Sequence, residues 1–75
     1  MTNYDIEYIS NALDIAFEAM SRSLDQIEGV SMVIDDANID VPTIDKDILK
    51  SIAREVTDAQ TLLMCYIKDL KSRKQ

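Results

Sequence analysis

Oxygen-bearing side chains alternate along one short stretch of the chain. Asp36, Asn38 and Asp40 stand at every second position, and Asp47 follows seven residues later. Carboxylate and amide oxygens at alternate loop positions are the ligands that wrap a calcium ion. The same residue types also dominate ordinary loops, because their side chains bond nearby backbone groups. Asp36, Asn38, Asp40 and Asp47 are therefore a candidate metal site, and a metal-responsive protein is one interpretation of the chain.

This stretch resembles the start of an EF-hand calcium loop. The resemblance places the first three side chains at loop positions one, three and five, and Asp47 at position twelve. Two residues depart from the family pattern, since Val41 stands where the sharp turn takes Gly and Asp47 replaces a bidentate Glu. The resemblance covers this loop alone and implies a calcium ligand set there.

Catalytic chemistry finds few suitable residues. The chain has no His and a single Cys, so it lacks the commonest general base and the ligands of the usual zinc, haem and di-iron sites. Cys65 is either an exposed thiol one turn from Lys68 or a small hydrophobe buried at an interface. The composition predicts a protein that is not an enzyme and holds no cofactor.

Charge is distributed unevenly between the two halves of the chain. Residues 1–40 contain nine acids and one base, whereas residues 41–75 contain five acids and seven bases. We expect no direct nucleic-acid binding, because phosphate contacts need a concentrated basic face. Helical spacing places five carboxylates on one line, which we call the acidic line: Glu7, Asp14, Glu18, Asp25 and Glu28. This line either pairs with a basic line on the second helix (Lys46, Lys50, Arg54 and Lys68) or imitates nucleic-acid phosphates and so inhibits a nucleic-acid-binding protein.

Two long amphipathic helices are predicted to position these residues. The first, over residues 4–34, follows a seven-residue apolar repeat: Ile6, Leu13, Met20, Ile27 and Ile34. Its companion positions are Ile9, Ala16, Phe17, Leu24 and Val30. Thr2 or Asn3 can cap its start. The second, over residues 45–72, begins after Pro42 with Asp45 or Thr43 as its cap. Its predicted core face is Ile48, Ile52, Val56, Ala59, Leu63, Tyr66 and Leu70.

Equal helices joined by a short loop, residues 35–44, predict one all-α domain folded as an antiparallel two-helix hairpin. A second apolar stripe remains beside the hairpin core of the first helix: Tyr8, Ala12, Ile15, Ala19, Val30 and Val33. The second helix adds Leu62, Met64 and Cys65 outside its own core face. One facing helix cannot cover both stripes, and contiguous exposed apolar surface is typical of an interface.

The simplest way to bury this interface is self-association into a dimeric, coiled-coil-like four-helix bundle. Burial against a different protein, or a compact monomer with broken helices, are the alternatives. The chain's start lacks a basic segment followed by an apolar one, and no apolar run reaches ~18 residues, so we expect a cytoplasmic protein without a membrane partner. The predicted function is that of a non-enzymatic homodimer that binds a protein partner and regulates or stabilises it.

Overall fold

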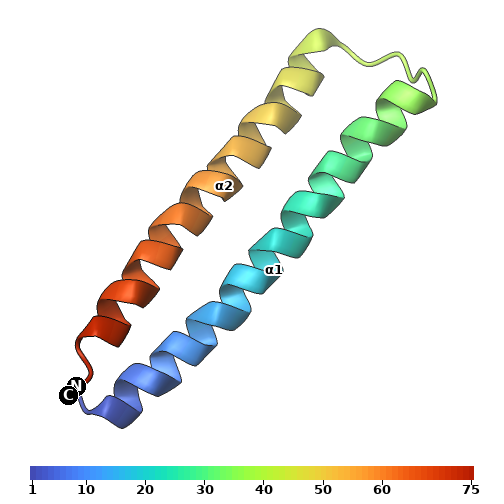
Figure 1. Cartoon of the computed structure of the whole chain (residues 1–75). Coiled ribbons are helices and arrows are strands. Elements are labelled where there is room, and N and C mark those ends of the chain that lie inside the picture. The colour runs from blue at the N-terminus through green and yellow to red at the C-terminus, as the bar shows by residue number, and fades with distance from the viewer.

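The computed structural model describes all 75 residues and contains two helices and no strands. Helix α1 spans Asn3–Asp36 and helix α2 spans Thr43–Ser72. The helices lie side by side, and the chain's two ends meet at the end of the rod opposite the connecting loop (Figure 1). The molecule measures 56 × 16 × 11 Å, and this arrangement fits a helical hairpin. Neither helix has a stretch of the length and apolarity that spanning a bilayer requires.

The start of α1 is fixed by a capping box. Thr2 is the N-cap, as one of the two predicted alternatives has it: its Oγ1 accepts the N–H of Asp5 at 3.1 Å, and its own N–H donates to the Asp5 carboxylate at 3.0 Å. The bond from the Thr2 N–H to the carboxylate favours its charged form and lowers the pKa of Asp5 below the ordinary aspartate value. The cap therefore stabilises the helix at neutral pH, and its contribution is lost as acid protonates Asp5.

The start of α2 differs from the prediction. Neither Asp45 nor Thr43 is the cap; Pro42 occupies that position, and no side chain bonds the first turn. The Pro42 carbonyl instead accepts the N–H of Asp45 at 3.0 Å. The proline ring restricts the φ of Pro42 to a value close to that of a helix, here −56°. Thr43 is the first helical residue after it. Asp45 still lies in the first turn, where its carboxylate complements the helix dipole.

The loop is shorter than predicted, because both helices extend into the Asp-rich stretch. Asp36 ends α1, and only residues 37–42 connect the helices. Just beyond the helix end, Asn38 adopts a φ of 52°, the left-handed conformation that asparagine tolerates better than most residues. Gly29 does not interrupt α1, so the alternative with broken helices does not describe the chain.

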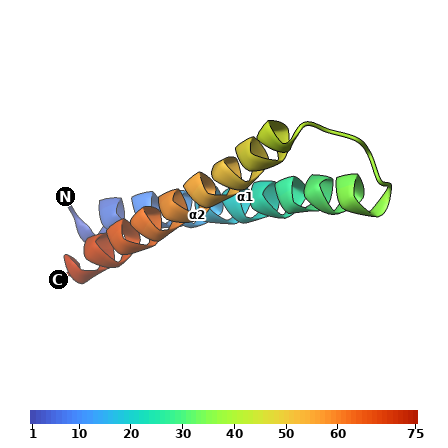
Figure 2. The same ribbon diagram turned by 90° about the horizontal axis from the view of Figure 1, so that it is seen from above.

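The two helices meet along a seam whose positions alternate in steps of four and three. On α1 the seam comprises Ile6, Ser10, Leu13, Phe17, Met20, Leu24, Ile27, Ser31 and Ile34. On α2 it comprises Leu49, Ala53, Val56, Gln60, Leu63, Ile67 and Leu70. All of these residues are buried or half-buried. A mean spacing of about 3.5 residues keeps one line of each helix facing its neighbour over many turns. Figure 2 shows the shallow crossing of the helices that accompanies such packing.

The predicted core face is confirmed for the heptad repeat of α1 and wrong in part elsewhere. All five positions of that repeat belong to the seam, as do its companions Phe17 and Leu24. Ile9 and Ala16 lie half-buried beside the seam, and Val30 is exposed. On α2 the predicted residues Ile48, Ile52, Ala59 and Tyr66 are exposed. Successive residues of the predicted α2 face are on average about 3.7 positions apart, compared with about 3.5 for the seam. The predicted face therefore rotates around α2 relative to the seam and cannot contact α1 along its whole length. The true seam is harder to find in the sequence because it includes the polar residue Gln60.

Full burial is confined to the end of the rod that carries the termini. Only Ile6, Ser10, Ile67 and Leu70 are fully buried. The Asn3 side chain reinforces this end by donating to the Gln75 carbonyl at 2.6 Å and accepting the Gln75 N–H at 3.0 Å. No residue in the loop half of either helix is fully buried, so the packing weakens toward the loop.

Ser10 is a buried hydroxyl without a hydrogen-bond partner. An unsatisfied buried polar group costs about 1–3 kcal/mol, and alanine has a higher helix propensity than serine. Ser10→Ala should therefore raise the free energy of unfolding by about 1 kcal/mol, measured by chemical denaturation. Ser23→Ala, at an exposed position of the same helix, controls for helix propensity. Equal gains from the two variants would contradict a cost specific to burial.

Candidate interaction surfaces

Ion pairs between the helices mark one broad side of the rod, which we call the charged face. Lys71 lies 3.8 Å from Asp14, and Lys46 lies 3.8 Å from Asp35. At the terminal end, Lys74 lies 3.5 Å from Glu7. All of these side chains are at least partly exposed, so each pair adds little to stability. The ion pairs nevertheless identify the flank of α1 and the flank of α2 that lie on the same side of the rod.

The acidic line is exposed throughout and is only partly neutralised. Asp14 pairs with Lys71 of α2 and Glu7 with Lys74 just beyond it, whereas Glu18, Asp25 and Glu28 make no ion pair. Of the predicted basic line, Lys46 pairs across the helices, and Lys50, Arg54 and Lys68 have no carboxylate within salt-bridge distance. The predicted complementarity thus exists, but Lys71 and Lys74 supply most of it. Ammonium groups therefore border the acidic line only at its terminal end, and its other three carboxylates stand without an ion pair.

The opposite broad side of the rod is richer in apolar residues, although Glu55 and Asp69 lie seven residues on either side of Leu62 on the same flank of α2. At about 100° per residue, the flank of each seam that faces away from the ion pairs is occupied largely by apolar residues. We call this surface the apolar face; it comprises Ala12, Ala16, Ala19, Val30 and Val33 of α1 with Ile48, Ile52, Ala59, Leu62 and Tyr66 of α2. All except the half-buried Ala16 are exposed, Leu62 to 74% of its possible area. Both helices therefore present apolar side chains on the same side.

The predicted interface residues divide among three locations. Ala12, Ala19, Val30, Val33 and Leu62 lie on the apolar face. Tyr8, Ile15 and Cys65 are also exposed, but helical geometry directs them away from the seam, at the outer edges of the rod. Met64 lies on the charged face, beside Lys68. Of the two predicted environments for Cys65, the single chain has the exposed one.

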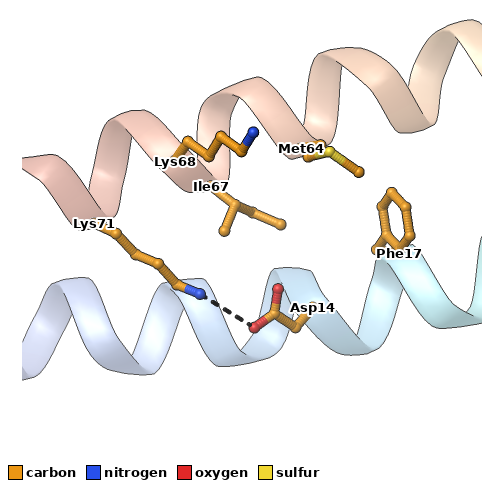
Figure 3. Close-up of a pocket in the computed structure, with 6 residues that line it drawn as sticks. All are labelled: Asp14, Phe17, Met64, Ile67, Lys68 and Lys71. Carbon is orange, nitrogen blue, oxygen red and sulfur yellow. Dashed lines mark ion pairs between the residues drawn. The ribbon is translucent and has the colours of Figure 1, made fainter.

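Met64 belongs to a recess of about 250 Å³ on the charged face, lined by Asp14, Phe17, Met64, Ile67, Lys68 and Lys71. Met64 and Phe17 point toward one another from the two helices, and the Lys71–Asp14 pair crosses between the helices at the other end (Figure 3). Ile67 is buried, while Met64 is 44% exposed. The recess thus combines apolar walls with two ammonium groups and one carboxylate.

Gln60 is a polar seam residue that the sequence pattern did not reveal. Its Nε2 donates to Ser21 Oγ at 2.6 Å and to the Phe17 carbonyl at 3.3 Å. A polar group at a seam position favours the register that satisfies its hydrogen bonds. The signal in the sequence is the four-and-three repeat from Leu49 to Leu70, in which Gln60 is the one polar member.

The Asp-rich stretch does not gather into a carboxylate cluster. No three Asp, Glu or Cys side chains anywhere in the chain lie close enough together to hold a metal ion. Asp36 and Asp47 belong to α1 and α2 respectively, and only Asn38 and Asp40 remain in the loop. Helix α1 ends at position one of the loop that the EF-hand resemblance implies, and helix α2 begins at its position eight, Thr43.

Comparison of the chain with protein-family models, with curated proteins and with solved structures finds no match.

Proposed function

We propose that this chain is a non-enzymatic interaction protein that acts as a homodimer and binds a further protein. In this proposal two antiparallel hairpins pack their apolar faces together as a four-helix bundle, and their charged faces remain outside for the partner. The observation that carries the proposal is the apolar face, to which both helices contribute. Exposed apolar surface of this extent on one side of a small chain is typical of a protein interface.

The size of the exposed surface supports a second copy as the occupant of the apolar face. The chain exposes 5749 Å², whereas a compact monomer of its 8.5 kDa mass exposes about 4,700 Å². The excess, about 1,000 Å², is close to the ~800 Å² that each partner buries in a standard protein interface. The radius of gyration is 17.1 Å, against about 11 Å for a compact domain of 75 residues. Pairing two rods side by side buries part of the excess surface and makes the particle more compact for its mass.

Symmetry further favours a second copy. A twofold dimer needs one self-complementary surface, and the residues that define the apolar face are all uncharged, with Glu55 and Asp69 beside them on α2. Small side chains on α1, Ala12 and Ala19, lie on the same face as the larger Leu62 and Tyr66 of α2, so two copies can alternate small with large residues across the interface. The charged faces then point outward on both sides of the bundle, which leaves them free to bind another protein.

Neighbouring substitutions on α2 provide the test. Leu62 lies on the apolar face and Thr61 on the charged side, and both are exposed in the single chain. Leu62→Glu and Thr61→Glu add the same charge one residue apart. By sedimentation equilibrium, the wild type and Thr61→Glu should be dimers at micromolar concentration, and Leu62→Glu should dissociate at least about tenfold more readily, because a desolvated carboxylate without a partner is costly.

A monomeric wild type would overturn the homodimer. If Leu62→Glu and Thr61→Glu weakened the dimer equally, added charge rather than the apolar face would determine association. Circular dichroism of each variant establishes that the helices persist, since an exposed substitution in a single chain has little effect on helix content.

A further inference from the structure

We infer that the recess lined by Phe17, Met64 and Ile67 is a docking site for a segment of another protein in which a bulky apolar side chain stands next to a carboxylate. This inference rests on the proposed function, because it names the chemistry of the protein partner and uses the face that the proposed dimer leaves outside.

The walls of the recess select an apolar side chain. Phe17 and Met64 come from different helices and face one another, and Ile67 lies between them and the ion pair (Figure 3). Its volume, about 250 Å³, is below the 300–1,000 Å³ of typical small-molecule pockets, so the recess suits a single large side chain. The exposed thioether of Met64 adapts to aromatic or branched groups, because methionine is flexible and polarizable.

The charges at the recess select an adjacent carboxylate. Lys71 is engaged with Asp14 at 3.8 Å, whereas the Lys68 ammonium has no carboxylate within salt-bridge distance. In Figure 3 the Lys68 side chain extends toward Met64 rather than toward Asp14. One free ammonium beside an apolar recess complements a single negative charge. The Asp14 carboxylate in the same recess disfavours a doubly charged phosphate group.

The probe for this site is the peptide acetyl-Gly-Phe-Asp-Gly-amide, compared with its counterpart in which Asn replaces Asp. Titration into the wild-type protein should shift the methyl resonance of Met64 in a saturable manner, followed by NMR at low salt. The Asp peptide should bind about threefold more tightly than the Asn peptide, the size expected of one exposed ion pair. Lys68→Gln should abolish this difference. Lys50→Gln removes an unpaired lysine of the same helix outside the recess and should leave the difference unchanged.

Three results would overturn the assignment: no shift of the Met64 methyl up to about 10 mM peptide, equal binding of the two peptides to the wild type, or loss of the difference in Lys50→Gln. Sedimentation of the same samples separates this inference from the proposed function. A wild type that dimerises but does not bind the peptide refutes the recess alone, and a monomer that binds it refutes the dimer alone.

Discussion

Ile6→Ala should unfold a large fraction of the protein under conditions in which Ile15→Ala leaves it folded. Ile6 is 2% exposed and belongs to the small fully buried cluster, whereas Ile15 is 66% exposed on the same helix. Removal of a buried isoleucine side chain costs about 2–5 kcal/mol through lost burial and an unfilled cavity. A natural domain of 75 residues has only about 4–11 kcal/mol in total, and a chain with so few buried residues lies toward the low end.

Ile15→Ala is the matched control because it removes the same atoms from α1. At an exposed position that removal costs little, and the higher helix propensity of alanine offsets part of it, so the expected change is within about 0.5 kcal/mol. The free energies of unfolding come from urea denaturation of both variants and the wild type at one protein concentration. If Ile6→Ala and Ile15→Ala lowered the free energy of unfolding by similar amounts, the seam at the terminal end would not be what holds the helices together.

The sequence was sufficient to predict the helices and one of their two faces. The heptad from Ile6 to Ile34 is apolar at each predicted position, and no other face of α1 has so regular a spacing, so its seam could be identified directly. Local residues also narrowed the cap of α1 to Thr2 or Asn3, of which the structure has Thr2. The same kind of signal was wrong for α2, where Pro42 occupies the cap position.

The seam of α2 could not be identified in the same way, because two apolar lines compete on that helix. Ile48 and Ile52 are as hydrophobic as Leu49 and Ile67, and Gln60 makes the true seam look less apolar than it is. Only the pairing with α1 distinguishes them, since the neighbour supplies Ser21 and the Phe17 carbonyl for the Gln60 amide. The recess was missed for the same reason: Phe17 and Met64 are 47 positions apart in the chain and meet only in the packed pair.

The uneven burial along the rod leads to a prediction about local stability. All four fully buried residues lie at the terminal end, and the loop half holds exposed apolar residues such as Val33, Ile48 and Ile52. In a single chain, the loop half should therefore open without unfolding of the terminal half, because local opening is easiest where few apolar contacts are buried. In the proposed dimer these same residues are covered. Opening of the loop half then requires either dissociation of the dimer or exposure of the apolar surface that the second copy buries.

Amide hydrogen exchange of the wild type and of Leu62→Glu measures this difference. At a protein concentration at which Leu62→Glu is monomeric and the wild type is dimeric, the amides of residues 27–36 and 47–56 should exchange about a hundredfold faster in the variant, which corresponds to a few kcal/mol of added local stability from the covered surface. The amides of residues 8–17 should differ much less, because the intramolecular seam around Ile6, Ser10, Ile67 and Leu70 protects them in both proteins. The substitution lies in the terminal half, so an effect concentrated at the loop half cannot come from local damage around Leu62.

Uniform acceleration of exchange along both helices would instead indicate that the chain folds only as an assembly. No acceleration of exchange anywhere would mean that the apolar face does not carry the association.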